Sequence, residues 1–499
     1  MADETLADAP DLVARNPATG RPIGRVPVTP VGQVAGLVAE ARSAQAGWAS
    51  TSDRERSAAL DRWRVALARD AEGWAVAIRD EVGKPSGEAL VEVVAALDAI
   101  RWTARHGRRA LADERLGPGH QRAMLVGPAR LRWRPFGVIG MIGTWNYPLL
   151  LNAPAIAQAL FAGNGVAWKP SELAPLLGDR LRASLDAAGL PAGLVATVQG
   201  GGEVGAALAA SGIDKALFTG GIATGRRVLG DLGGRGIPAV AELSGFDAAI
   251  VLPDSPRAAT ANTLAWAAFV GAGQACVAVK RVDAVGDPAP WADALAARAR
   301  SLRVGDPSAS EVDVGPMISE AARSRFDASI RAAEAAGAVV VAGGRALDGP
   351  GWFYAPTVLR ADGPGPEAAL AGCFGPVVLV RGFPSGDDAV DAANASPFGL
   401  AASVWGRDLR EARRLADRLD AGMVSINDAV TPSAHASAPF GGNGASGHGR
   451  TRGPLGLREF ARPCTIQSRR PGGLRPQLFP YSGRMATLMT WYLRAFHRR

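Results

Sequence analysis

The chain has 499 residues, of which 47% are hydrophobic and 20% are charged, a composition typical of a globular protein. Because one hydrophobic core rarely grows past about 250–300 residues, we expect at least two domains. The net charge is +8, but we find no aromatic–basic platform, zinc-ligand spacing or recognition-helix pattern. We therefore predict neither nucleic-acid binding nor a metal site.

The cysteines and the N-terminal segment bear on the compartment. Cys276, Cys373 and Cys464 are widely spaced and show no pairing pattern, which is typical of a reducing environment. Residues 1–11 are acidic and have no apolar core, unlike a signal peptide. The uncharged stretch 138–168 is long enough to span a membrane, but a Trp-Asn-Tyr-Pro turn and several glycines interrupt it. We therefore expect a cytoplasmic location.

Helical spacing of apolar residues appears first in the chain and predicts helices over 34–48, 57–82 and 89–109. Strands and helices then alternate, which is typical of a parallel sheet covered on both faces. The expected strands are 137–142, 165–168, 195–199, 215–219 and 239–243, and the expected helices between them are 154–162, 176–188, 203–210 and 223–232.

A second α/β stretch begins near Gly245. Together the two stretches predict an α/β fold of two doubly wound parallel-sheet domains, with a cleft between them where the strands end. The elements expected in the second stretch are helices near 261–271 and 321–336 and strands near 339–342, 377–381 and 402–405.

Two glycine loops are candidates for phosphate binding. The loop 200–205 matches G-x-G-x-x-G, but a chain with 62 glycines contains such strings by chance, so a tight strand–helix turn is the favoured interpretation. In the loop 218–226 a strand ends in Thr219-Gly220-Gly221 and a helix begins at once. The N–H groups of that turn then face an incoming phosphate.

Two charged residues follow another predicted strand. Lys169 and Glu172 supply a cation and a carboxylate that together suit a ribose diol, and a solvated capping turn is the alternative interpretation.

Three further residues suit thioester chemistry. Cys276 ends a turn of small residues, Glu242 closes a strand at the predicted domain junction, and Asn146 lies in the Trp-Asn-Tyr-Pro turn. A thiolate adds to an aldehyde carbonyl, an amide donor stabilises the oxyanion, and a carboxylate activates the water that hydrolyses the thioester. A buried structural cysteine is the usual alternative for an isolated cysteine.

From about Asn16 to Pro463 the sequence resembles the aldehyde dehydrogenase superfamily, because these motifs occur in the family's order and spacing. The segments 374–376 (Phe-Gly-Pro) and 439–442 (Pro-Phe-Gly-Gly) match two later family signatures. The resemblance implies a nucleophile, a general base and an oxyanion donor at Cys276, Glu242 and Asn146. It also implies cofactor contacts at Trp145, Lys169, Glu172, Thr219, Gly220, Gly221, Gly225 and Phe374.

The implied reaction is NAD(P)-dependent oxidation of an aldehyde to a carboxylic acid through a cysteine thiohemiacetal and a thioacyl-enzyme. The carboxylate of Glu242 favours hydrolysis over transfer to coenzyme A, and Glu172 favours NAD, with NADP also open. A dehydrogenase that acylates coenzyme A and a non-catalytic binding or assembly subunit are the alternatives.

Two positions depart from the family pattern. Gly221 replaces the usual serine, but the backbone donors of the turn remain. Gly372 stands where the family normally has a glutamate that binds the nicotinamide ribose. Loss of that charge-assisted bond, worth about 1.5–3 kcal/mol, predicts a looser nicotinamide end and slow hydride transfer.

The resemblance also implies a domain plan and assembly as a homodimer or homotetramer. The plan assigns 1–114 and 135–244 to a coenzyme-binding domain, 245–442 to a catalytic domain, and a β-hairpin arm for oligomerisation to 115–134 and 443–468.

The tail 469–499 lies beyond the usual end of the family and is strongly basic. It is expected either to pack on its own or a partner subunit, which we favour, or to lie on an anionic membrane. Its apolar helical stripe consists of Met485, Leu488, Met489, Tyr492, Leu493 and Phe496.

Overall fold

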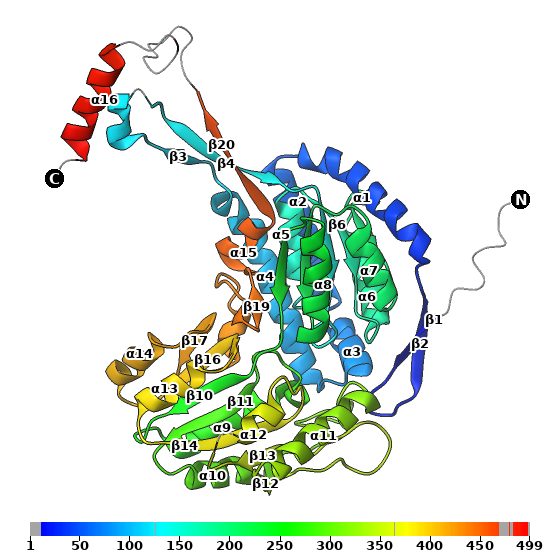
Figure 1. Ribbon diagram of the computed structural model, residues 1–499. Coiled ribbons are helices and arrows are strands. Elements are labelled where there is room, and N and C mark those ends of the chain that lie inside the picture. Colours follow the sequence, from blue (N-terminus) through cyan, green and yellow to red (C-terminus); the bar gives the residue numbers. More distant parts are fainter. Residues whose placement is uncertain (1–10, 125, 364, 469–478, 480–482, 498–499) are drawn as a thin grey trace, which may run out of the picture.

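The structure is a computed structural model that describes residues 11–124, 126–363, 365–468, 479 and 483–497. The described residues form one large sheet of six strands and one of seven, both flanked by helices (Figure 1). A smaller antiparallel sheet projects from the body of the molecule. The α/β fold class predicted from the sequence is confirmed, whereas the exact domain boundaries stay a prediction.

A hairpin and four helices begin the described chain. The single helix predicted over 57–82 is wrong, because the chain leaves helical geometry at Asp70 (φ −117°, ψ 29°). Aspartate competes with the backbone for hydrogen bonds, which favours it at helix ends. The elements are β1 (Asp11–Arg15), β2 (Pro22–Pro27), α1 (Val34–Ala49), α2 (Asp53–Arg69), α3 (Ala71–Val82) and α4 (Ser86–Ala110).

The six-stranded sheet has the order β19-β9-β8-β5-β6-β7 and is parallel except for β19 at its edge. The alternation of strands and helices predicted over 137–243 is confirmed. The strands are β5 (Val138–Ile142), β6 (Gly165–Lys169), β7 (Val195–Thr197), β8 (Lys215–Thr219), β9 (Ala239–Glu242) and β19 (Gly447–His448), and the helices are α5 (Ala153–Phe161), α6 (Pro175–Ala187), α7 (Gly202–Ala210) and α8 (Ile222–Gly234).

The register of this sheet brings three predicted site residues to one edge. Ile142 at the end of β5 pairs with Lys169 at the end of β6, and Thr219 at the end of β8 pairs with Glu242 at the end of β9. Because carboxyl ends of parallel strands share an edge, these side chains lie where an open α/β sheet binds its ligand.

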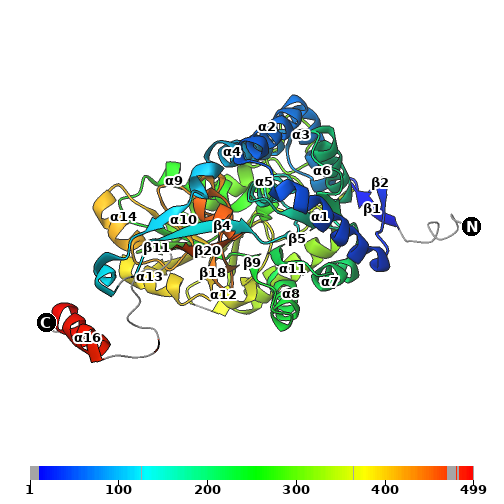
Figure 2. The same cartoon turned by 90° about the horizontal axis from the view of Figure 1, so that it is seen from above.

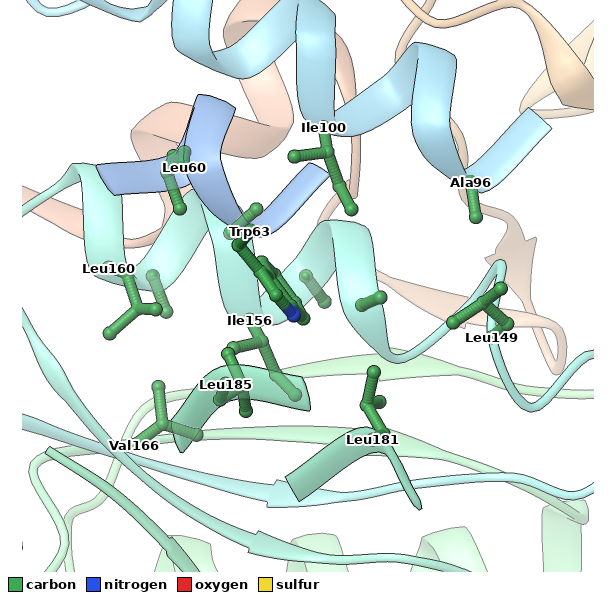
Figure 3. Packing of buried hydrophobic residues seen from close by; sticks show 14 of the residues in the cluster. Leu60, Trp63, Ala96, Ile100, Leu149, Ile156, Leu160, Val166, Leu181 and Leu185 are labelled. Carbon is green, nitrogen blue, oxygen red and sulfur yellow. The ribbon is translucent and has the colours of Figure 1, made fainter. Parts of the chain in front are cut away.

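A large apolar cluster fixes the helices against this sheet. Trp63 of α2 is fully buried, and its indole Nε1 donates a hydrogen bond of 2.9 Å to Ser184 Oγ of α6. Figure 3 shows Trp63 among aliphatic side chains from α2, α4, α5, α6 and β6. Burial of such side chains stabilises the fold by about 1.5–3 kcal/mol each. The neighbours labelled there include Leu60, Ile100, Ile156, Leu160, Val166, Leu181 and Leu185.

The seven-stranded sheet follows in the chain and has the order β12-β13-β14-β11-β10-β16-β17, with β12 antiparallel to β13. Its strands are β10 (Asp247–Val251), β11 (Val279–Val285), β12 (Val339–Ala342), β13 (Thr357–Arg360), β14 (Val377–Phe383), β16 (Ala401–Trp405) and β17 (Met423–Ile426), and its helices are α9 (Arg257–Phe269), α10 (Ala289–Ser301), α11 (Glu320–Ala335), α12 (Gly365–Leu370), α13 (Gly386–Asn394) and α14 (Leu409–Ala416).

The projecting sheet is built from β3 (Glu114–Leu116), β4 (Ala129–Pro135) and β20 (Ala461–Gln467). Strand β20 pairs antiparallel with β4 of the same chain, from Ala461 opposite Pro135 to Gln467 opposite Ala129. The predicted hairpin arm is therefore confirmed as a structural element.

Helix α16 (Gly483–Phe496) stands at the far end of this arm, apart from the body of the molecule (Figures 1 and 2). The remainder of the predicted tail, 469–478 and 480–482, lies outside the described residues. In the part of the chain that the structure describes, no helix has the length and hydropathy needed to cross a membrane.

Candidate active site

The predicted catalytic residues come from three segments that meet between the two large sheets. Asn146 follows β5, Glu242 ends β9, and Cys276 precedes β11. The chain passes from the first sheet to the second directly after Glu242. All three side chains line one cavity of about 450 Å³. The structure thus brings together residues that are up to 130 positions apart in the sequence.

A tight loop presents Cys276. Gly271, Ala272 and Gly273 all have positive φ angles, of 62°, 54° and 67°. A Cβ atom at Gly273 would collide with the carbonyl group of Gly375, so glycine is required there. Lys280, which is 2% exposed, donates from Nζ to the carbonyl oxygens of Gly273 (2.8 Å) and Gly375 (2.6 Å). This buried lysine therefore holds the cysteine loop against the segment that carries Phe374.

The Asn146 amide is fixed beside this loop. Its Oδ1 accepts a hydrogen bond of 2.8 Å from Thr144 Oγ1, and its Nδ2 donates one of 3.0 Å to the carbonyl oxygen of Gln274. The side chain is buried. The Asn146 amide therefore contacts Gln274, which lies two residues before Cys276 in sequence, and lines the same cavity as Cys276, as an oxyanion donor requires.

Glu242 is a buried carboxyl group. Neither carboxylate oxygen has a hydrogen-bond partner among the described residues. Burial raises the pKa of Glu242 well above its ordinary value, and the guanidinium groups of Arg450 and Arg452 partly oppose that rise. A carboxyl group with such a raised pKa suits general-base work near neutral pH. Gly441 approaches closely, because a Cβ atom there would lie 2.9 Å from Glu242 Oε1.

The nucleophile Cys276 is partly buried. Burial, together with the carboxyl groups of Asp247 and Glu242 and partly opposed by Arg452, raises the pKa of Cys276 to about 12. The resting thiol is therefore protonated at neutral pH. Its activation needs a base, and Glu242 lines the same cavity.

The predicted cofactor residues line a cleft of about 550 Å³ that continues from the first cavity, with Thr219, Gly220 and Gly221 common to both. Lys169 Nζ lies 3.0 Å from Glu172 Oε2, and the Glu172 side chain is half exposed, so it remains available to a ligand. A Cβ atom at Gly221 would meet open space at the start of α8. The donors and the space therefore fit a dinucleotide phosphate at the helix N-terminus.

Of the other predicted cofactor residues, Trp145 lines both this cleft and the cavity of Cys276, Phe374 lines only the latter, and Gly225 lines neither. Trp145 and Phe374 meet edge to face, with ring centroids 5.7 Å apart and planes at 88°, and both line the cavity of Cys276. Gly225 is buried in α8, and a Cβ atom there would collide with Leu243 after β9, so glycine permits close helix–strand packing.

The glycine string 200–205 and Gly372 add two observations. Gly202 and Gly205 line the same cleft as Lys169, although the favoured interpretation of that string was a turn alone.

Gly372 lines the cavity with Cys276. A side chain there would find open space, but its φ of +77° is strained for any residue except glycine. The weaker grip on the nicotinamide ribose stays a prediction.

A third cavity, of about 840 Å³, lies on the other side of the thiol. Cys276, Leu151 and Phe440 line both this cavity and the first one. Its remaining wall is mainly apolar, as in many small-molecule sites. The nucleophile thus stands where two cavities meet. The apolar lining includes Leu150, Trp266, Phe269, Val270, Val312 and Val430.

Comparison with known proteins defines the class. The model of the aldehyde dehydrogenase family matches residues 6–466, and the chain belongs to this family. It is an oxidoreductase that acts on the aldehyde group with NAD or NADP as the acceptor.

Individual relatives cover almost the whole chain. A Mycobacterium bovis protein named succinate-semialdehyde dehydrogenase 1, whose name gives NADP(+) as cofactor, is 33% identical over 90% of this chain and 98% of its own length. A Mycobacterium tuberculosis aldehyde dehydrogenase complexed with NAD+ is 30% identical, with a TM-score of 0.89 over 94% of this chain and 97% of its own. Lactaldehyde dehydrogenase from Escherichia coli is 27% identical, with a TM-score of 0.88 over 93% and 96%.

Proposed function

We propose that Cys276, Asn146 and Glu242 carry out the oxidation of an aldehyde to a carboxylic acid. The observation that carries this proposal is their common cavity, in which a thiol, an amide donor and a buried carboxyl group converge. Glu242 accepts the thiol proton, and the Cys276 sulfur adds to the aldehyde carbon to form a thiohemiacetal. Asn146 Nδ2 stabilises the oxyanion, because an amide dipole that is already in place needs no reorganisation.

The second half of the reaction releases the acid. Bound NAD or NADP would supply the hydride acceptor for the thiohemiacetal carbon, and Cys276 would then hold the acyl group as a thioester. After Glu242 has released the thiol proton to solvent, it takes a proton from water and the resulting hydroxide adds to the thioester carbon. The carbon–sulfur bond then breaks, which releases the acid and returns Cys276 as a thiolate. The cavity on the nicotinamide side admits that water, since Glu242 lines it.

The cofactor is held by residues of the first sheet. The backbone N–H groups at the start of α8, from Gly221 on, receive the pyrophosphate, whereas the Gly220 N–H donates to the Glu242 carbonyl oxygen at 3.1 Å and Gly220 only borders the phosphate. Lys169 with Glu172 receives the adenosine ribose. Support comes from the cleft that these residues share and from the free end of α8. Trp145 and Phe374 border the nicotinamide end of this cleft.

The experiment is a steady-state assay of NADH or NADPH formation over short, aromatic, long-chain and semialdehyde substrates. Cys276→Ala should abolish turnover. Glu242→Gln should slow both the first-turnover formation of reduced cofactor and the steady-state rate, because the same carboxylate activates the thiol and the water. If the wild-type protein turned over none of the aldehydes, the non-catalytic alternative would be supported. Turnover that depends on added coenzyme A would support a dehydrogenase that acylates coenzyme A.

Assembly follows from the arm. We propose a homodimer or homotetramer in which the β3–β4–β20 sheet contacts a partner subunit. Strand β20 lies at the edge of this sheet and is largely exposed, so its outer backbone groups are available for pairing. The tail is proposed to pack on the same partner, since α16 stands at the end of the arm.

A further inference from the structure

Arg452 lies on the wall of the 840 Å³ cavity, beside Cys276, and the reaction proposed above does not use it. The side chain is buried, and its Nη1 has no hydrogen-bond partner among the described residues. Its guanidinium carbon stands over the Phe440 ring, 5.0 Å from the centroid. The Arg452 charge interacts with Cys276 and Glu242, but no carboxylate of the described residues lies at ion-pair distance from it. A buried guanidinium without such a partner is unfavourable, so this arrangement points to an anion that binds there.

The backbone of Arg452 supports the same conclusion. Its φ of 59° and ψ of 168° lie in a region that is almost restricted to glycine. The buried amide of Gln158 fixes this conformation, because Oε1 accepts from the Arg452 N–H (3.1 Å) and Nε2 donates to the Gly453 carbonyl (3.3 Å). Residues held in such strained conformations cluster at ligand sites.

The acidic groups along the described wall are already engaged. Glu92 bonds Lys84 at 2.6 Å. Glu88 accepts from the Gly271 N–H at 3.0 Å through Oε2, and its Oε1, which has no hydrogen-bond partner among the described residues, lies 3.9 Å from Lys84 Nζ. Asp313 bonds Arg303. Glu242 lines the other cavity and has a raised pKa, which Arg452 partly opposes. None of these carboxyl groups therefore forms an ion pair with the buried guanidinium.

Burial lowers the pKa of Arg452 to about 10, so the group is charged at neutral pH. The other arginine on the described wall, Arg298, is exposed to solvent at the mouth. A charged, buried and unpaired arginine is thus particular to the deep part of this cavity.

We propose that Arg452 binds the carboxylate of the substrate, which makes the preferred substrates short aldehydes that carry a carboxylate at the other end. This inference rests on the proposed function. A planar guanidinium pairs well with a carboxylate and supplies the hydrogen bonds that Nη1 lacks. The apolar wall receives the intervening methylene groups. Because Arg452 and Cys276 line the same cavity, one small molecule contacts both.

A different role for Arg452 would be electrostatic support of the Cys276 thiolate. That role would act on every aldehyde equally, since each one reacts with the same sulfur. A carboxylate anchor acts only on substrates that carry the charge. The two roles are therefore separated by a pair of substrates with the same shape and different charge.

The test compares succinic semialdehyde with isocaproaldehyde, in which an isopropyl group replaces the carboxylate. In the wild-type enzyme we expect a kcat/KM at least about tenfold higher for succinic semialdehyde. Arg452→Met removes a charge that acts on Cys276 and Glu242 with either substrate, so it should lower kcat/KM for both aldehydes. The loss should be about 10- to 100-fold greater for succinic semialdehyde, mostly through KM. Arg452→Lys should recover part of the loss, and Arg298→Met, an exposed cation at the mouth, should keep the wild-type preference.

A binding measurement separates this inference from the proposed reaction. Calorimetry should show that the wild-type protein binds succinate at least about tenfold more tightly than isocaproate, and that Arg452→Met loses the difference. Equal loss for both aldehydes in Arg452→Met, or equal binding of the two acids by the wild-type protein, would overturn the proposal. Absence of turnover together with selective succinate binding would contradict the proposed function alone.

Discussion

Glu242 shows how one buried side chain ties activity to pH. Its raised pKa means that it is protonated, and cannot accept a proton, over a range in which an exposed glutamate is already ionised. We therefore expect kcat, where thioester hydrolysis limits it, to fall as the pH decreases through a midpoint clearly above 4.5. The measurement is a pH profile of kcat. A flat profile down to pH 5 would contradict this role.

The raised pKa of Glu242 also makes the stability of the fold depend on pH. Its contribution to stability decreases as the pH rises, whereas its contribution to kcat increases. A carboxyl group whose pKa is raised by folding favours the folded state fully below its unfolded pKa, and that contribution is lost as the pH rises through the raised value. Glu242→Gln should therefore melt at a higher temperature than the wild type at pH 8 and show little difference at pH 4.5, while its turnover falls about 10²- to 10⁴-fold. A lower melting temperature at pH 8 would contradict it.

At the level of elements, α4 holds the turn that carries Asn146. Glu92 of α4 has a fully buried side chain, bonds Lys84 at 2.6 Å, and accepts from the Leu149 and Leu150 N–H groups at 2.9 and 3.2 Å. One carboxylate thus fixes both a buried lysine and the backbone just after the Trp-Asn-Tyr-Pro turn.

Removal of the Glu92 carboxylate should lower the stability of the fold. Glu92→Ala leaves Lys84 with only the more distant Glu88, at 3.9 Å, and the Tyr147 ring, and it leaves two N–H groups without a partner. We therefore expect a loss of about 3 kcal/mol in the free energy of unfolding. Asp98→Ala, on an exposed position of the same helix, is the matched control and should change it by less than about 0.5 kcal/mol. Denaturant unfolding measures both, and equal effects would show that Glu92 has no special role.

The elements also show what the sequence could and could not predict. Strands of the first sheet were predictable because their apolar runs alternate with helical segments. Strand β11 was missed because it carries Lys280, Arg281 and Asp283, which are buried there only through partners from other segments, such as Arg381 with Asp283. Cys276, Glu242 and Asn146 were predictable from family motifs. Arg452 gave no signal, since its burial and lack of a partner depend on tertiary contacts.

At the scale of the whole molecule, the tail and arm extend the chain beyond the catalytic body. The described tail contacts the turn η2 (Gly119–Met124) at the tip of the arm, where the His120 ring lies 5.3 Å from Phe496. No residue of α16 is buried, and the Trp491 and Leu493 side chains are more than half exposed. An apolar helix of this kind is expected to be covered in the assembled protein.

We expect a chain that ends at Arg470 to have the same kcat and the same melting temperature as the full-length chain. It should, however, form a smaller assembly. Light scattering after size-exclusion chromatography measures the assembly, and flotation with anionic vesicles checks the membrane alternative. The prediction fails if the mass is unchanged while only the full-length chain floats with lipid.

The position of Cys276 between two cavities has a consequence for the order of events in a catalytic cycle. The cavities proposed to receive the aldehyde and the nicotinamide end of the dinucleotide share Cys276, Leu151 and Phe440, whereas their other lining residues differ. The acid can therefore depart through one opening while the reduced dinucleotide still fills the other. An inhibitor bound in the aldehyde cavity would then leave binding and release of the dinucleotide unchanged, so the two cavities can be inhibited independently.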